Sequence, residues 1–330
     1  MIETIYYEED IAGHPRTRAI MSRFKKASLI PIDRYGEIFN RKNQSFRIQK
    51  KSPSLILARK HNGHVLKAPA GFGIGDDLNF YFSHMYNCLY DCEYCFLQGM
   101  YSSASYVVFV NYEDFELQLE SVLKNNSYQK ITFFSGYDCD SLAFENVTGF
   151  VSHFLPFFQR NSEALLELRT KSYQLQPLLS SEPIQNCVVA FSLMPEVMAL
   201  ALDHKAPSIK RRIEAMKTLS QKGWRIGLRF DPLIYGKNWK DLYSDLLTEI
   251  FEQLPSESIH SITYGALRFP KKMHKIVSAS HPNSKLFVRL FQNDNGIMTY
   301  GKEIENDMIK YCTRLSLNYV SEKLIFHSIS

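Results

Sequence analysis

Three of the six cysteines lie close together in the chain, at Cys88, Cys92 and Cys95. In a reducing compartment, clustered thiols indicate metal or redox chemistry rather than a disulfide framework. Three thiolates can hold three corners of an iron–sulfur cubane, whereas ordinary electron-transfer clusters use four cysteine ligands. A loop with three ligands therefore predicts a cluster with one iron open to a chelating cofactor.

A closed zinc site is the alternative for these thiols, and a chance grouping is the third interpretation. His84 lies four residues before Cys88, and three cysteines with one histidine form a known structural zinc set. Structural zinc sites usually pair short spacings on both sides, whereas here the three thiols share one loop, which favours the cluster. The isolated Cys187 and Cys312 are interpreted as buried small hydrophobic residues.

Short apolar or β-branched runs after residue 78 predict the strands that position this loop. They cover residues 79–85, 130–136, 165–171, 188–194, 225–234 and 261–269. Helical periodicity separates the runs, most clearly over residues 115–125, 150–159, 208–223 and 240–254. Strands that alternate with helices form parallel βα units.

The alternation predicts an α/β fold. Consecutive right-handed crossovers would curl six strands into an open, partial (β/α)6 barrel, with a flat doubly wound sheet as the alternative. In either fold the active site lies at the carboxyl ends of the strands. Because the cysteine loop directly follows the first predicted strand, it is expected at this catalytic edge.

The remaining segments are predicted to flank the barrel. Residues 1–75 are expected to form a basic amino-terminal extension packed on the barrel, residues 76–270 the barrel core, and residues 271–330 a carboxyl-terminal extension without a recognisable motif. Within the first of these, the runs SFRIQ (45–49) and SLILAR (54–59) are candidate strands. The segment 63–75 is rich in glycine and proline and predicts a loop.

The composition indicates a soluble globular protein, because the net charge is +5 and hydrophobic residues make up 45% of the 330 residues. This excludes disorder over most of the chain, which is long enough to bury a sizeable core. No apolar run reaches the ~18 residues of a membrane span, and the acidic start MIETIYYEED is unlike a signal peptide. We therefore expect a cytoplasmic protein without a membrane partner; the oligomeric state stays open.

Positive charge is concentrated in one segment. Between Arg16 and Lys67 there are 14 Lys and Arg but only two acidic residues, Asp33 and Glu37, so the segment carries +12 and the rest of the chain −7. Such a segment is a candidate surface for a polyanion. A solvated face around a few strands is the alternative interpretation.

The sequence around the cysteines, HMYNCLYDCEYCFLQG (84–99), resembles the radical S-adenosylmethionine (SAM) superfamily. Further segments extend this likeness to the spore photoproduct lyase family: FNRKNQSF, VLKAP, DSLAFENVTGF, LLELRTKS, VVAFSLMPEV, SIKRRIEAM, GLRFDPLI and TYGALRF. The resemblance covers about residues 35–270. It implies a partial radical SAM barrel, a [4Fe-4S] cluster on Cys88, Cys92 and Cys95, and SAM bound at the open iron.

The resemblance also implies an activity. An external electron donor such as flavodoxin or ferredoxin would reduce the cluster, and SAM would be cleaved to a 5′-deoxyadenosyl radical that abstracts hydrogen from its substrate. In this family the expected substrate is a thymine-type lesion in DNA, which a protein must flip out of a duplex before acting on it. The basic segment agrees with DNA as a partner.

Several cofactor-binding residues are implied by position. Lys171, at the end of the third predicted strand, and Ser192, at the end of the fourth, match positions that the family uses for the SAM carboxylate. For Lys171 an exposed lysine at the barrel edge is the alternative. After the second strand, the superfamily usually has a Gly-Gly-Glu-like turn near the SAM amino group. In this chain the corresponding residues are Ser135, Gly136 and Tyr137, so the glutamate is missing. Gly136 still allows the backbone to approach SAM closely.

The sequence departs from the family at the step that returns hydrogen to the product radical. The family uses a cysteine three residues before the aspartate matching Asp140, with neighbouring tyrosines as a relay. Tyr137 occupies that position, whereas Cys139 directly precedes Asp140. Of the two tyrosines beside the last cluster cysteine, Tyr94 is kept and the other is Phe96. Cys139 and Tyr94 are therefore the candidate catalytic residues.

Three functions stay open at this level. The first is a radical SAM enzyme that repairs damaged DNA. The second is a radical SAM enzyme of the same lineage with another substrate, which the departures at Tyr137 and Phe96 favour. The third is a nucleic-acid-binding protein with a structural metal.

Overall fold

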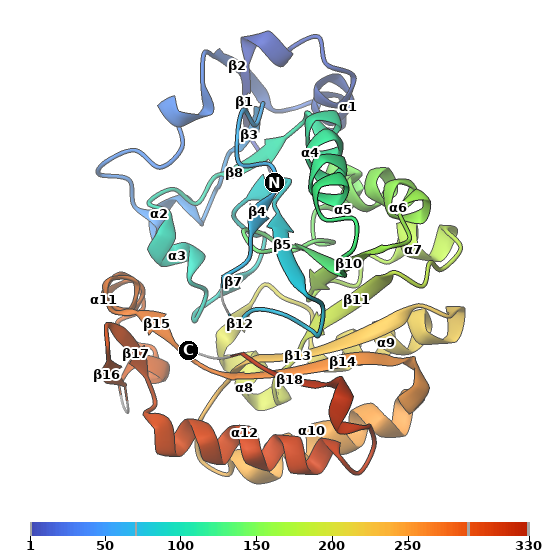
Figure 1. Cartoon of the computed structure of the whole chain (residues 1–330). Coiled ribbons are helices and arrows are strands. Elements are labelled where there is room, and N and C mark those ends of the chain that lie inside the picture. Colours follow the sequence, from blue (N-terminus) through green and yellow to red (C-terminus); the bar gives the residue numbers. More distant parts are fainter. Residues whose placement is uncertain (1, 70, 289–290, 329–330) are drawn as a thin grey trace.

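The computed structural model describes residues 2–69, 71–288 and 291–328, and within them a curled sheet of eight strands forms a half-barrel (Figure 1). Six of these strands are parallel and follow one another in chain order: β5 (Leu78–Phe82), β9 (Ile131–Ser135), β10 (Ala164–Thr170), β11 (Cys187–Ser192), β13 (Arg225–Leu233) and β14 (Ile259–Ala266). The short β4 (Leu66–Lys67) pairs antiparallel with β5, and β18 (Ile325–His327) pairs parallel with β14.

This strand order confirms the predicted partial barrel. A doubly wound sheet would reverse its strand order at a switch point. From β5 to β14 the order never reverses, so the flat alternative is wrong. Each of the six predicted runs overlaps one of these strands.

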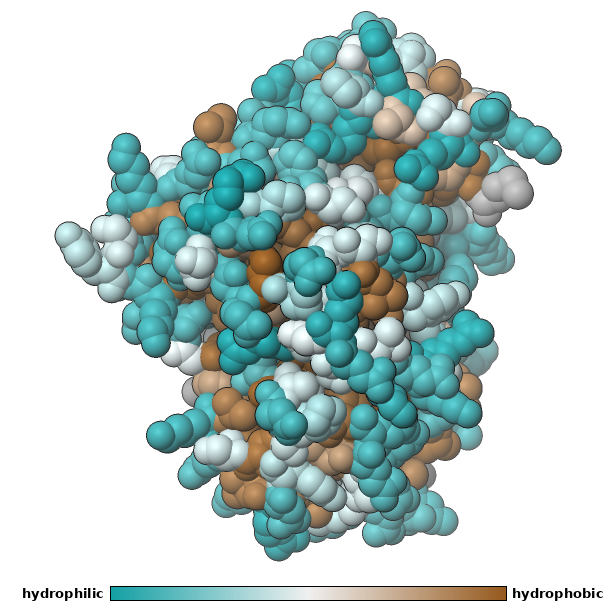
Figure 2. Space-filling model, turned by 90° about the vertical axis from the view of Figure 1, so that its right-hand side faces the viewer, coloured by the Kyte–Doolittle hydropathy of each residue, from teal (hydrophilic) through white to brown (hydrophobic). Residues whose placement is uncertain are grey.

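The predicted helices also form, as α4 (Tyr112–Asn125), α6 (Phe150–Arg160), α9 (Ile209–Lys222) and α10 (Trp239–Gln253). α9 begins after Ser208, whose side chain accepts a hydrogen bond from the Arg211 amide, and ends at Gly223 in the left-handed region. The apolar sides of these helices pack on the sheet in one large core. The side of the molecule that carries α6 and α9 is mostly hydrophilic, with hydrophobic side chains in small patches (Figure 2).

Shorter elements complete the barrel region. They are β7 (Asp91–Cys92), α3 (Leu97–Met100), α5 (Glu145–Thr148), α7 (Gln176–Ser180), α8 (Glu196–Leu202) and β12 (Asp203–His204). β7 and β12 pair antiparallel, so a segment that follows α8 holds the loop of the three cysteines.

A second sheet lies on the amino-terminal side of the barrel. Its strands, in order across the sheet, are β2 (Ser28–Ile32), β1 (Thr4–Glu8), β3 (Leu55–Ala58), β8 (Tyr106–Phe109) and β6 (Met85–Tyr86). Helix α1 (Pro15–Arg23) connects β1 to β2. This sheet joins the amino-terminal segment to β6, which precedes the cysteine loop, and to β8, which follows it. The domain boundary at residue 75 stays a prediction.

The predicted strand at SLILAR is confirmed as β3, but the strand predicted at SFRIQ is wrong. That segment forms the helical turn α2 (Phe46–Gln49). Phe46 and Lys50 are both buried, whereas Ile48 is 71% exposed. Burial therefore follows the i, i+4 spacing of a helix rather than the alternation of a strand.

The carboxyl-terminal segment contributes α11 (Lys271–Ser280), α12 (Lys302–Ser316) and a small sheet of β15 (Phe269–Pro270), β17 (Ile297–Thr299) and β16 (Gln292–Asp294). α11 packs against α3, directly after the cysteine loop, and α12 packs against α10 and β14 (Figure 1). In the described residues, none of the helices combines the length and apolar character that crossing a bilayer requires.

Candidate active site

A cavity of about 500 Å³ lies at the carboxyl ends of the barrel strands, next to the cysteine loop. Every residue that the sequence singled out for cluster binding, SAM binding or catalysis lines it: Cys88, Cys92, Tyr94, Cys95, Gly136, Cys139, Lys171 and Ser192. These residues span more than a hundred positions of the chain. The structure thus brings all of them together, while their individual roles stay predictions.

Backbone hydrogen bonds hold the cysteine loop in a compact turn. The Cys95 amide donates to the Cys92 carbonyl at 3.0 Å, and the Gln98 side chain donates to the same carbonyl at 2.7 Å. The Lys50 ammonium donates to the Cys88 carbonyl from the amino-terminal side. The loop is therefore fixed from both of its ends, which is what a set of metal ligands requires.

The chemistry of the three thiols fits a metal cluster. Burial raises the pKa of Cys88 to about 12, and it also raises the pKa of Cys92 and of Cys95. Without a cation they stay protonated, and a bound metal would displace the protons. Three thiols from one loop line one cavity, and they would be the residues that hold such a cluster.

His84, the fourth ligand of the zinc alternative, has other neighbours. Its ring stacks on Phe150, and its Nδ1 lies 3.9 Å from the Cys139 sulfur. Its ring is fully buried, and burial lowers the pKa of His84 to about 3.

A buried charge network lies beneath the cavity. Lys171 Nζ lies 3.9 Å from Asp203 Oδ1, and the Arg212 guanidinium donates to Asp203 Oδ2 at 2.6 Å. The Tyr94 hydroxyl donates to Asp203 Oδ1. Burial would raise the pKa of Asp203, but the two cations lower it below its usual value. Asp203 is therefore a fixed anion that pairs with Lys171 and accepts hydrogen bonds from Arg212 and Tyr94.

Lys171 is held as a cation inside the site rather than at its edge. Its side chain is only 15% exposed, so the alternative of an ordinary exposed lysine is wrong. Burial alone would lower the pKa of Lys171, but the Asp203 carboxylate raises it above the usual value. Arg212 also donates to the Ser192 carbonyl at 2.9 Å, which connects the second predicted SAM residue to the same network.

The turn at Gly136 requires glycine. Its φ is +84°, and a Cβ atom there would approach Ser141 Oγ to 2.7 Å and the Arg169 carbonyl oxygen to 3.0 Å. Asp140, four residues later, accepts hydrogen bonds from Thr170 Oγ1 and the Lys171 amide, both at 2.7 Å. Asp140 therefore fixes the end of β10, which carries Lys171.

Cys139 and Tyr137 lie on this turn but in different surroundings. The Cys139 thiol is 7% exposed and belongs to the core of the amino-terminal sheet, next to His84. The Tyr137 ring stacks on Tyr81 with a centroid distance of 4.4 Å and lies 5.6 Å from Phe96. Tyr137 lines the cavity together with Phe96.

Sequence reasoning did not single out several residues of the site. Arg169 could have been found, because strand alternation places it on the same face as Lys171. Arg268, which follows β14, forms an ion pair of 3.2 Å with Asp231 near the end of β13. Both residues lie in segments that were noticed only for their family likeness. Other contributors gave no sequence signal, because they reach the site through distant pairings or later segments: Asp203, Arg212, Met273 and Ile297.

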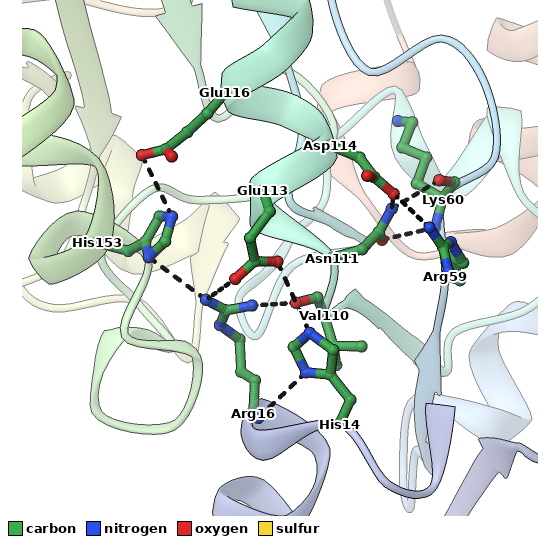
Figure 3. A network of polar contacts seen from close by, with 10 residues as sticks. All are labelled: His14, Arg16, Arg59, Lys60, Val110, Asn111, Glu113, Asp114, Glu116 and His153. Atoms are coloured by element: carbon green, nitrogen blue, oxygen red, sulfur yellow. Dashed lines mark hydrogen bonds and ion pairs between the residues drawn. The ribbon is translucent and has the colours of Figure 1, made fainter. Parts of the chain in front are cut away.

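The basic segment divides into two groups. Four arginines form ion pairs and two lysines are buried: Arg16, Arg34, Arg47, Arg59, Lys50 and Lys60. Arg16 and Arg59 reach the acidic residues of the first turn of α4, at 3.3 Å from Glu113 and 3.0 Å from Asp114 (Figure 3). In the described part of the chain the others are exposed without an ion pair: Arg18, Arg23, Lys25, Lys26, Arg41, Lys42, Lys51 and Lys67.

Comparison with known proteins gives one consistent family. The sequence model of spore photoproduct lyase matches residues 80–312. Spore photoproduct lyase from Bacillus subtilis (strain 168) is 22% identical over 202 residues, which cover 60% of this chain and 59% of that relative. The enzyme of the same name from Clostridium acetobutylicum is 21% identical over 292 residues, 87% of this chain and 84% of the relative. The chain thus spans only 59% of the Bacillus relative's length.

Solved structures share the whole fold. A cysteine-to-serine mutant of spore photoproduct lyase superimposes with a TM-score of 0.85 at 14% identity, covering 100% of this chain and 98% of the other. A double mutant with bound AdoMet and dinucleoside spore photoproduct gives a TM-score of 0.84 at 15% identity with the same coverage. At such identities the match establishes a common fold.

Proposed function

The chain belongs to the spore photoproduct lyase family, and on this premise we propose that it is a radical SAM enzyme that repairs a thymine-type lesion in DNA. The observation that carries the proposal is the convergence of three loop thiols, Lys171 and Ser192 on one cavity at the carboxyl ends of the strands. A relative of the same fold binds AdoMet together with dinucleoside spore photoproduct, which supports both the cofactor and the substrate class.

A [4Fe-4S] cluster on Cys88, Cys92 and Cys95, reduced by a flavodoxin- or ferredoxin-type donor, would supply the electron that splits bound SAM into methionine and a reactive 5′-deoxyadenosyl radical. The role of the protein is to bind, orient and shield. Lys171, whose charge Asp203 fixes, would pair with the SAM carboxylate, and Ser192 would donate a hydrogen bond to it. Gly136 leaves room for close approach of the backbone.

The walls of the cavity suit a flipped base. Apolar and aromatic side chains that would exclude water line it, including Phe72, Phe134, Leu267 and Phe269. The Arg169 guanidinium lies 5.1 Å from the ring centroid of Phe72 and offers a flat cation beside an aromatic face. Flipping a lesion out of a duplex costs a few kcal/mol, which contacts to phosphates and stacking would offset.

The exposed cations of the basic segment support DNA as the partner. Lys67 is exposed and lies two residues before Pro69, which lines the cavity. Lysine and arginine side chains that neutralise phosphates supply the sequence-independent part of DNA affinity.

The test uses full-length protein reconstituted with iron and sulfide without oxygen, given dithionite, SAM and dinucleoside spore photoproduct. We expect release of 5′-deoxyadenosine and conversion of the lesion to two thymidines, both followed by mass spectrometry. Release of 5′-deoxyadenosine with an unchanged lesion would favour an enzyme of the same lineage with another substrate. If no 5′-deoxyadenosine is released, a nucleic-acid-binding protein with a structural metal would be the remaining interpretation.

A further inference from the structure

Repair through a substrate radical ends with the return of a hydrogen atom to the product. Thiol S–H and phenol O–H bonds are weak enough to donate it, whereas an aliphatic hydroxyl is not. Apart from the predicted cluster ligands, the residues of these two types that line the cavity are Cys139, Tyr90, Tyr94 and Tyr137. The donor should be the one whose S–H or O–H group faces the cavity and is not committed elsewhere.

The Cys139 thiol is buried in a hydrophobic core. Its sulfur lies 3.9 Å from Nδ1 of His84, a ring that is itself buried against Phe150. Cys139 belongs to the core of the amino-terminal sheet, together with Met85 and Phe144. Although the residue lines the cavity, it is only 7% exposed. We therefore expect the thiol to have little access to a substrate there.

The hydroxyl of Tyr94, in the cysteine loop, is committed to another partner. It donates a hydrogen bond to Asp203, within the network of Lys171 and Arg212. The Tyr94 O–H group is therefore not directed at a substrate in the cavity. Tyr90 lies between the predicted cluster ligands Cys88 and Cys92, and its phenol lies near Ser172.

Tyr137 is placed differently. Its ring is held between Tyr81, at 4.4 Å, and Phe96, at 5.6 Å, with Phe72 meeting it edge-on at 6.0 Å. The ring is therefore fixed by stacking, while its hydroxyl makes no hydrogen bond to any residue that the structure describes. It follows Gly136 directly on the turn that the cavity shares with β9.

We propose that Tyr137, and not a cysteine, returns the hydrogen atom to the product radical. This inference rests on the proposed function and concerns its last step. The O–H bond of Tyr137 breaks homolytically, a C–H bond forms on the product carbon, and Tyr137 is left as a phenoxyl radical. One electron from the flavodoxin- or ferredoxin-type donor and one proton from water then restore the phenol.

The central experiment compares Tyr137→Phe with Cys139→Ser in reconstituted protein supplied with SAM and dinucleoside spore photoproduct. Tyr137→Phe keeps the stacked ring and removes only the O–H group. We expect it to release 5′-deoxyadenosine at the wild-type rate but to form thymidine at least tenfold more slowly. Cys139→Ser should form thymidine at the wild-type rate, and Tyr137→Cys should recover part of the activity because a thiol is a competent donor.

An isotope measurement follows the hydrogen itself. The phenol proton exchanges with solvent, so wild-type protein in deuterated water should place one deuterium in the repaired thymidine. Tyr137→Phe should give little such product. Freeze-quenched wild-type samples should show the spectrum of a tyrosyl radical by electron paramagnetic resonance, and Tyr137→Phe samples should not.

A second test needs neither the cluster nor turnover. In metal-free protein, iodoacetamide should alkylate Cys139 as slowly as the buried Cys187 and Cys312, and more slowly than the half-buried Cys88 and Cys95. Rapid labelling of Cys139 would overturn the assignment. Loss of thymidine formation in Cys139→Ser with full formation in Tyr137→Phe would overturn it as well. Wild-type protein that releases no 5′-deoxyadenosine would defeat the proposed function together with this inference.

Discussion

The floor of the cavity and the amino-terminal basic segment use charge in opposite ways. At the cavity, Lys171, Asp203 and Arg212 are buried and hold one another at fixed positions. In the basic segment, most cations that are not ion-paired are exposed, for example Lys25 and Lys26. Buried charge costs desolvation but orients a ligand, whereas exposed charge attracts a polyanion without fixing its position.

This difference between buried and exposed charges predicts which substitutions the protein tolerates. Loss of one buried group leaves its partners uncompensated in a dry environment, so the effects should be large and local. Loss of one exposed cation should be small, additive and dependent on salt. The variants below test this contrast, beginning with the largest expected effect.

Cys92→Ala should abolish cluster binding. Cys92 is the buried middle thiol of the loop, and its carbonyl accepts hydrogen bonds from both the Cys95 amide and the Gln98 side chain. We expect loss of most iron and of all SAM cleavage, measured by iron analysis and by 5′-deoxyadenosine release under dithionite. Cys187→Ala, a buried thiol in β11, is the control and should keep both. Retained iron and SAM cleavage in Cys92→Ala would exclude this loop from the chemistry.

Asp203→Asn should test whether the buried anion holds the network together. The substitution keeps the shape of the side chain but leaves Lys171 and Arg212 without a compensating charge. Breaking a buried pair in this way typically costs about 3–5 kcal/mol. We expect a loss of this size in the free energy of unfolding, measured by urea titration of the metal-free protein. Asp245→Asn, at an exposed position of α10, should change it by less than about 0.5 kcal/mol.

Part of the candidate site could be predicted from the sequence alone, because its residues lie in local patterns. Cys88, Cys92 and Cys95 could be found from the sequence because the three thiols lie in one short loop. Lys171 and Ser192 were proposed from the family likeness, and their places at the ends of β10 and β11 follow from apolar patterns that are local. The same holds for α9, whose limits at Ser208 and Gly223 follow from capping chemistry.

Features created by contacts between distant segments could not be predicted. Asp203 lies next to Lys171 and Tyr94 only because β12 pairs with β7 across more than a hundred residues. The burial of the Cys139 thiol depends on the core of the amino-terminal sheet, and no local pattern encodes that burial. The wrong prediction of a strand at residues 45–49 has the same cause. Tertiary contacts bury Phe46 and Lys50 on one side, and this burial favours a helical turn.

Lys171→Ala should lower SAM affinity without removing the cluster. A hydrogen bond between charged groups contributes about 1.5–3 kcal/mol, so we expect the dissociation constant to rise by roughly 10- to 150-fold. Calorimetric titration of SAM into anaerobic, reconstituted protein measures this change. Lys217→Ala, at an exposed position of α9, should bind SAM like the wild type. An unchanged affinity in Lys171→Ala would mean that this ammonium serves only Asp203.

The smallest effect should come from the basic segment and should appear in the salt dependence. If Lys25 and Lys26 contact phosphates, the double alanine variant should reduce the slope of log affinity against log salt by about 0.9 for each lost contact with duplex DNA. Binding is measured by fluorescence anisotropy at several salt concentrations.

Arg16 is the matched control within the same segment, because its guanidinium already lies 3.9 Å from the Tyr112 ring and reaches Glu113 and His153 (Figure 3). Arg16→Ala should leave the salt slope unchanged and instead lower the free energy of unfolding by about 1–3 kcal/mol. A change of slope in Arg16→Ala but not in the lysine variant would reverse the division of this segment into a DNA-binding and a structural group.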